Sequence, residues 1–285
     1  MTLTKRVQPW SFRDASRQRK ALTMGWQLEK SNHKVFEKNT LVVVASQLRF
    51  HPILLIKDGK HIAEFQEKIR SRFPIFSEQI ARVIVSQPNP SDGEVKIETL
   101  EEKQYLFKKE DGSTTILLSS SSLALENRNH EERSQLISDF DMAINALLAI
   151  YAPVSARRIG LRYVNVIDKS KISGDLGREV NWAQLITEKF LTCPEGMVNL
   201  ENTLFYSEFT SPMPEPLLGA MTLRYGLIRA SDPVVKFRFD TDRYLEGAFD
   251  VSSTSEKITS FADDIFSLFI SAAGPELQTW MKAKE

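Results

Sequence analysis

Two carboxylates near the end of a predicted strand are the residues best placed for metal chemistry. Asp240 and Asp242 stand two positions apart, so in an extended strand both side chains point to the same side. Such a pair can hold a divalent cation, but the sequence places no third acidic ligand beside them. We therefore expect no metal here and favour the alternative that these carboxylates are solvated or bind arginines.

No other pattern points to catalysis. The four histidines have no metal-ligand spacing, and His130 lacks the second histidine of a zinc-binding helix. No serine lies in a Gly-x-Ser-x-Gly turn, and Gly174 and Gly177 do not open a phosphate-binding loop. We therefore expect no cofactor and no enzymatic activity.

Arginines in four similar triplets are the candidate binding residues of the body. Each lies between two large apolar residues, as in Leu161-Arg162-Tyr163. Because strand residues alternate between faces, each triplet puts its apolar side chains on one face and its guanidinium on the other. A guanidinium is a planar donor that suits carboxylates and phosphates. The four are Arg49, Arg162, Arg224 and Arg238.

If the four strands belong to one sheet, these arginines share a face. One alternative is that the face is neutralised internally, with Glu126, Glu208 or Asp240 as partners. The other is that this face, or the cleft between two halves of the chain, binds an anionic ligand or a partner protein. Both alternatives stay open at this point.

A basic arm occupies residues 1–38, which hold nine Lys or Arg against three Asp or Glu. It can dock on an acidic partner, on nucleic acid or on an anionic membrane surface. The alternative is that its aromatic residues pack on the body while its charges stay solvated. The candidate binding residues of the arm are Trp10, Arg13, Arg17, Arg19 and Lys20.

Hydrophobic periodicity predicts the elements that position these residues. For the first half it predicts a strand over 40–56 with Pro52 at its end or at an edge position, a helix over 62–73, a strand over 81–86, a hairpin around Asp111-Gly112, a strand over 123–127 and a helix over 136–151. For the second half it predicts a strand over 157–168, a loop with Gly174 and Gly177, a short helix near Trp182, strands over 204–209, 220–228 and 234–242, and a closing helix over 258–272.

This order predicts an α+β protein made of two pseudo-repeated halves. Each half runs strand, helix, antiparallel strands, long helix, with the helices packed on one face of an antiparallel sheet. The predicted divisions are the basic arm at 1–38, the first half at 39–153 and the second half at 154–285.

Bulk composition favours a cytosolic protein. The 285 residues are 42% hydrophobic, enough for a proper core, and Lys+Arg balance Asp+Glu at 37 each. Cys193 is the only cysteine, so no internal disulfide can form. The first residues lack the apolar run of a signal peptide, and no long uncharged apolar run occurs.

Several segments in order resemble a known family. They include VFEKNTLVVVASQLRFHPILLI, SLALENRNHEERSQLISDFDMAINAL, RRIGLRYVNVID and FADDIFSLFISAAGPELQTW. Together they are similar to a sporadically distributed bacterial family of uncharacterised proteins, some encoded near phage-defence or mobile genes. The resemblance implies a component of a multi-gene system, and it supplies no catalytic residues.

Three functional hypotheses follow. The first is a non-enzymatic cytosolic binding protein, a sensor or adaptor in a defence or toxin-neutralising system that binds a protein encoded nearby. The second is a nucleic-acid or nucleotide binder that uses the arm and the strand arginines. The third is a metal-dependent enzyme that uses Asp240 and Asp242. Homo-oligomerisation is left open, and peripheral membrane contact through the arm is a minor alternative.

Overall fold

In the computed structural model, the residues described are 25–88, 95–130, 132–191, 200, 203–214, 218–229 and 234–282. Within them, nine strands form one antiparallel sheet accompanied by seven α-helices, so the protein is α+β. The strands are β1 (Leu41–Phe50), β2 (Ile75–Pro88), β3 (Val95–Lys108), β4 (Thr114–Ser119), β5 (Ser122–Asn127), β6 (Ala156–Ile167), β7 (Ser207–Pro212), β8 (Ala220–Arg229) and β9 (Val235–Phe249). The helices are α2 (Leu54–Lys57), α3 (Ile62–Ile69), α4 (Arg133–Tyr151), α5 (Lys169–Leu176), α6 (Trp182–Leu185), α7 (Thr254–Ala272) and α8 (Pro275–Met281).

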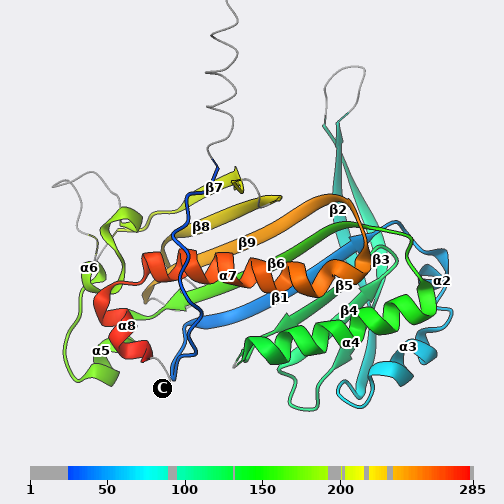
Figure 1. The fold of residues 1–285 in the computed structure, drawn as a ribbon, viewed down its shortest axis with the longest axis horizontal. Helices are drawn as coiled ribbons and strands as arrows, with labels where there is room; N and C mark the ends of the chain where they lie inside the picture. The colour runs from blue at the N-terminus through cyan, green and yellow to red at the C-terminus, as the bar shows by residue number, and fades with distance from the viewer. Residues whose placement is uncertain are drawn as a thin grey trace, which may run out of the picture.

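Strands β1 and β6 lie side by side in the interior of the sheet. The strand order is β2-β3-β4-β5-β1-β6-β9-β8-β7, with every neighbouring pair antiparallel (Figure 1). Strands that precede α4 in the chain therefore lie on one side of the β1–β6 pair, and strands that follow it lie on the other.

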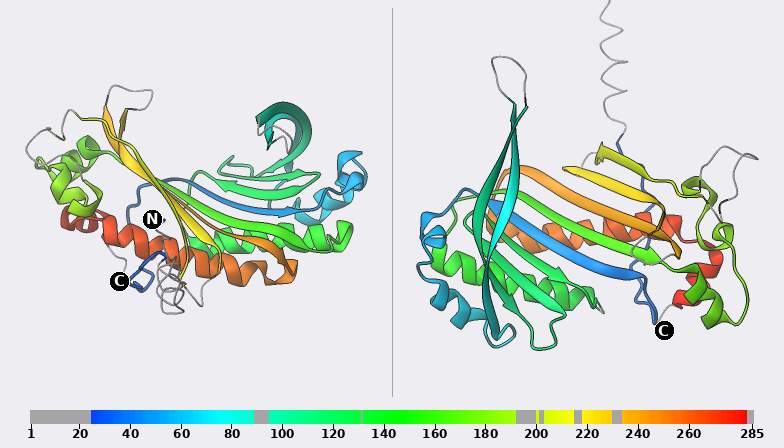
Figure 2. Two further views of the ribbon diagram at one scale, coloured as in Figure 1. Left: turned by 90° about the horizontal axis from the view of Figure 1, so that it is seen from above. Right: turned by 180° about the vertical axis from the view of Figure 1, so that it is seen from behind.

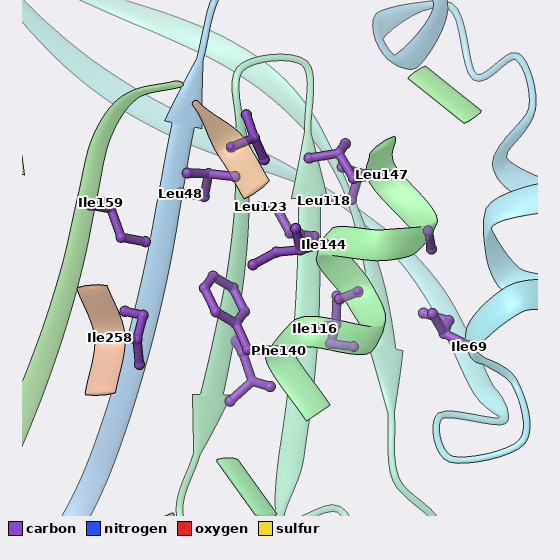
Figure 3. Packing of buried hydrophobic residues seen from close by; sticks show 14 of the residues in the cluster. Leu48, Ile69, Ile116, Leu118, Leu123, Phe140, Ile144, Leu147, Ile159 and Ile258 are labelled. Carbon is purple, nitrogen blue, oxygen red and sulfur yellow. The ribbon is translucent and has the colours of Figure 1, made fainter. Parts of the chain in front are cut away.

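Alternating burial along the strands marks the face that holds the core. In β1, Val44, Ser46, Leu48 and Phe50 are buried, while Ala45, Gln47 and Arg49 between them are more exposed. The apolar side chains of the buried set join Phe140 of α4 and Ile258 of α7 in one apolar cluster (Figure 3). Helix α4 packs on β5, and α7 packs on β6 and β9.

A second apolar cluster fills the end of the molecule formed by the later part of the chain. It joins Trp182 of α6, Phe237 and Phe239 of β9, and Leu277 and Trp280 of α8, all of them buried. The short helix predicted near Trp182 is α6, and its first turn is closed by a capping box.

Several expected elements are wrong in extent. The helix predicted over 62–73 ends at Ile69, and the strand predicted over 234–242 continues to Phe249. The strand predicted over 40–56 ends at Phe50, because Pro52 lacks the N–H that a strand ladder needs, and Leu54–Lys57 is helical instead. The predicted short strand over 81–86 lies within the longer strand β2. This strand begins at Ile75 and pairs with β3 along its whole length, so the two form a long hairpin.

One expected element has a different secondary structure from the predicted one. The segment with Gly174 and Gly177, expected to be a loop, contains helix α5. The Asp168 side chain accepts a hydrogen bond from the backbone N–H of Lys171 at the start of this helix. Gly177 ends it at φ 66°, a conformation that glycine adopts without strain.

Residues 25–39 form a strap that crosses α7 (Figure 1). The indole Nε1 of Trp26 donates to the carbonyl of Met221 at 2.8 Å, and the backbone N–H of Lys38 donates to the carbonyl of Met281 at 3.1 Å. Trp26 and Phe36 also pack against the second apolar cluster. The strap therefore joins α7, β8 and the end of α8.

The sheet is curved. At one edge, the β2–β3 hairpin curls to the side away from α4 and α7 (Figure 2, left). None of the described helices is long and apolar enough to cross a membrane.

Candidate functional site

The four arginines singled out in the sequence lie on the sheet face opposite the core. Directly paired residues of antiparallel strands project to the same side, and positions two apart in one strand share a face. By that rule the register puts all four on the face that Leu161 and Leu223 point away from. Their cross-strand neighbours are Arg158 for Arg49, Asp242 for Arg162, Asp240 for Arg224 and Val166 for Arg238.

Asp240 is the centre of this face. It is completely buried, and it accepts hydrogen bonds from Arg162 Nε at 2.8 Å, from Arg162 Nη2 at 2.7 Å and from Arg238 Nη2 at 2.7 Å. Burial raises the pKa of the Asp240 carboxyl, but the hydrogen bonds from both arginines outweigh burial and hold the pKa below its ordinary value. Asp240 is therefore a carboxylate that fixes two guanidinium groups.

Asp242 lies two positions after Asp240 on the same face and accepts fewer hydrogen bonds from arginine side chains than Asp240 does. It accepts one hydrogen bond from Arg158 Nη2 at 3.0 Å, and Arg158 also lies 3.7 Å from Glu246 and over the Tyr244 ring at 4.8 Å. Burial raises the pKa of the Asp242 carboxyl, and the nearby arginines only partly oppose it. A Cβ at Gly160 would lie 2.7 Å from the Arg158 guanidinium, so glycine leaves the room that Arg158 occupies.

The remaining two arginines differ from each other. Arg224 pairs with Glu208 of the edge strand β7 at 3.1 Å. Arg49 is exposed and has no ion pair or hydrogen bond with any described residue. It lines a hollow at the end of β1 together with His51, Arg157 and Arg158. Three of the four arginines are thus paired internally, whereas Glu126 pairs with Arg128 and not with this face.

We call this set of side chains the charged face. Across it, guanidinium and carboxylate groups alternate in equal number, so the set has no net charge and its members hold each other in place. The charged face consists of Arg158, Arg162, Arg224, Arg238, Glu208, Asp240, Asp242 and Glu246.

The arrangement does not favour a metal between Asp240 and Asp242. The carboxylates of both residues already accept hydrogen bonds from arginines. Among the described residues there is no group of three His, Cys, Asp or Glu side chains that could hold a metal ion. The candidate residues of the basic arm, Trp10, Arg13, Arg17, Arg19 and Lys20, lie outside the described residues, as does Cys193.

One feature of the interior could not be found from the sequence. A cavity between β6, α7 and the strap brings together His33, His130 and Tyr163. These residues are far apart in the chain, and neither histidine belongs to a ligand motif. Only their shared place against the buried side of β6 relates them, and that place depends on the tertiary fold.

No protein-family model matches the sequence, and no curated protein matches it either. The resemblance to a sporadically distributed bacterial family therefore stays a prediction. Function has to be inferred from the charged face and from the cavity.

Proposed function

We propose that the chain is a non-enzymatic cytosolic binding protein, a sensor or adaptor subunit that holds a protein partner on its charged face. The observation that carries the proposal is the fixation of Arg162 and Arg238 by the buried Asp240. Both arginines keep part of their surface in solvent, with side chains 43% and 36% exposed. Such groups are ordered before a partner arrives, so little side-chain entropy is lost on binding.

We further propose that the helices cover only one face of the sheet and that the partner binds the other face. Figure 2 (right) supports this, because no helix stands in front of β1, β6, β8 or β9 in that view. The partner is taken to be encoded nearby, as the family resemblance implies.

The balance of charge defines the partner's chemistry. A polyanion such as nucleic acid gains affinity from a net excess of Lys and Arg. Here Asp240, Asp242 and two glutamates offset the four arginines, so the face suits a surface that also carries both signs. Complementary charge of that kind fixes orientation and rejects wrong partners more than it adds affinity. A protein surface therefore fits better than nucleic acid.

The proposal also treats the two halves as structural repeats. In each half the first strand, β1 or β6, pairs with the last strand, β5 or β9, and the long helix α4 or α7 follows. The first half has one strand more than the second. A partner that spans the β1–β6 pair would then contact equivalent strands of both halves.

Anion binding is the second candidate, and one observation favours it. At the end of β1, Arg49 and Arg157 line a hollow with His51 and Arg158, opposed there by Glu246. Arg49 lies directly opposite Arg158, whose guanidinium is paired with Asp242 and Glu246, while Arg49 has no counter-ion among the described residues. In this second candidate function, the phosphate group of a nucleotide or nucleic acid binds in the hollow.

The test is co-purification followed by measured binding. The tagged chain is purified from the cells that encode it, the stoichiometric partner is identified, and its Kd is measured for wild type, Arg49→Glu, Arg224→Glu and the control Lys68→Glu. Arg49 and Arg224 lie at opposite ends of the charged side of the sheet, and neither reversal removes a fully buried pair. Lys68 lies on α3, which packs against α4.

We expect both reversals to weaken partner binding by about tenfold or more, roughly 1.4 kcal/mol, with an unchanged Kd for Lys68→Glu. Arg224→Glu faces Asp240 and Glu208 across the strands, so its melting temperature should fall while the protein stays folded at the assay temperature. We also expect a Kd that changes little with salt. Steep loss of binding with salt, with Arg49→Glu alone affected, would favour the anion-binding candidate. Full partner binding by both folded reversal variants would rule out the charged face as the docking surface.

A further inference from the structure

The cavity beneath the strap is mostly apolar. Its volume is about 90 Å³, and α7 supplies Ile265, Phe266 and Phe269 to its wall. The strap covers it, with the His33 ring 5.1 Å from the Phe266 ring and Phe36 stacked on Phe266 at 6.2 Å. The cavity is therefore walled by aromatic and aliphatic side chains from the core of the second half and from the strap.

Two polar groups in this wall have no partner. The His130 and Tyr163 rings lie 5.7 Å apart. Both residues are partly buried, and among the described residues no hydrogen bond joins their side chains to a protein group. By contrast, the hydroxyl of Thr40 in the same wall donates to Asn165 Oδ1 at 2.8 Å. An enclosed polar group without a partner costs about 1–3 kcal/mol, so such groups usually face a ligand or an ordered water.

Of the polar groups in the wall, His130 and Tyr163 are uncharged at neutral pH, whereas the charged side chains of Lys34 and Glu132 are exposed to solvent. Burial, with a smaller contribution from His33, lowers the pKa of His130 to about 4. Burial raises the pKa of Tyr163 to about 12. The nearest guanidinium, that of Arg133, is paired with Asp263. A charged ligand would lose its hydration here without gaining a counter-charge, whereas a neutral ligand would not.

The strap is held firmly on both sides of the cavity. On one side Lys30 pairs with Asp264, and the backbone N–H of Ser31 donates to Ser267 Oγ at 3.1 Å. On the other side the N–H of Lys38 bonds the end of α8. His33 lies between these anchors and is exposed, so it is the part of the cover through which a small molecule can enter.

We propose that this cavity binds a small uncharged molecule with an apolar body and one hydroxyl or carbonyl group, which hydrogen-bonds Tyr163 and His130. The ligand is at most a single ring, because an apolar cavity of about 150 Å³ binds one benzene and this cavity, at about 90 Å³, has no room for a second ring. The site is separate from the charged face, since Tyr163 points to the core side of β6 and Arg162 to the other.

Phenol is the probe that tests the site, with toluene and benzoate as its apolar and charged analogues. Binding to the full chain is followed by calorimetry and by the methyl signals of Ile265, with Ile69 as a distant control. The matched variants are Tyr163→Phe, which removes one hydroxyl and keeps the ring, and Tyr206→Phe, an exposed tyrosine outside the cavity.

We expect saturable one-to-one binding of phenol, with a Kd of about 1 mM or tighter as its few atoms allow, and shifts at Ile265 but not at Ile69. Tyr163→Phe should weaken phenol at least fivefold without lowering the melting temperature, while Tyr206→Phe should change neither. Toluene and benzoate should both bind more weakly than phenol. The proposal is overturned if phenol does not saturate, if Tyr163→Phe leaves its affinity unchanged, or if benzoate binds as well.

Discussion

Replacing Asp240 by asparagine removes the charge at the centre of the charged face and keeps the shape of the side chain. Asp240 is fully buried and accepts three hydrogen bonds, two from Arg162 and one from Arg238. Asparagine offers one acceptor oxygen and no charge, so the two-pronged contact with Arg162 cannot form. The change therefore leaves two guanidinium groups without their counter-ion.

The expected loss of stability follows from these contacts. A hydrogen bond to a charged group contributes about 1.5–3 kcal/mol, and breaking a fully buried ion pair costs about 3–5 kcal/mol. Solvent reaches Arg162 and Arg238 and screens their charges, so the loss should be smaller than for a fully buried pair. We expect Asp240→Asn to lower the free energy of unfolding by roughly 2–3 kcal/mol.

The control is Asp242→Asn on the same strand. The pKa of Asp242 is raised in the folded state, so its native form binds more protons and its charge lowers stability as pH rises. Neutralising it at pH 7 should therefore leave stability unchanged or raise it. The pKa of Asp240 is lowered, so its contribution is present above its unfolded pKa and is lost as pH falls through its folded pKa.

Urea unfolding at pH 7, followed by circular dichroism, measures both variants. A loss of less than about 0.5 kcal/mol for Asp240→Asn, the range of an ordinary surface substitution, would refute the central role of this carboxylate. So would a larger loss for Asp242→Asn than for Asp240→Asn.

Two further predictions concern the interior. The pKa of His130 is lowered from 6.5 to about 4, so the unfolded state binds more protons in that window and wild-type stability should fall by up to about 3 kcal/mol as pH drops through it. His130→Gln should flatten this acid limb in urea titrations between pH 4 and 7, and an unchanged slope would contradict the assignment. Phe140→Ala, in the centre of the core, should cost about 3–5 kcal/mol, whereas Phe209→Ala, whose ring is half-exposed, should cost less than about 1 kcal/mol by urea unfolding; equal losses would mean that the buried cluster is not the core.

Local pattern was enough to predict several elements because burial of one face dictates each of them. The apolar stripe around Phe140 and Leu147 predicts α4, and Pro153 marks its end one residue after Ala152 adopts a left-handed conformation. The triplet Leu161-Arg162-Tyr163 predicts which side chain of β6 leaves the core, since strand residues alternate.

Pairing across the sheet could not be predicted in the same way. Arg162 and Asp240 are 78 positions apart, and their contact depends on the register between β6 and β9. Nothing local in either strand specifies that register. The cavity at Tyr163 could not be predicted from local sequence either, because its wall comes from the strap, β6, α7 and the start of α4.

The length of the β2–β3 hairpin also escaped prediction. Before Gln104, β3 pairs only with β2, because β4 is short and pairs only with the last residues of β3. Long strands of this kind are visible only from the backbone pairing.

The most direct measurement of the proposed function is site-specific photo-crosslinking inside the cells that encode the protein. A photoreactive residue replaces Gln47, which lies on β1 opposite Gly160 on the charged side of the sheet, or Lys68, on α3. We predict a crosslink from position 47 to one protein that is absent from position 68 and is lost when Arg224→Glu is added. A crosslink to the same protein from position 68 alone, or one from position 47 that Arg224→Glu leaves unchanged, would contradict docking on the charged face.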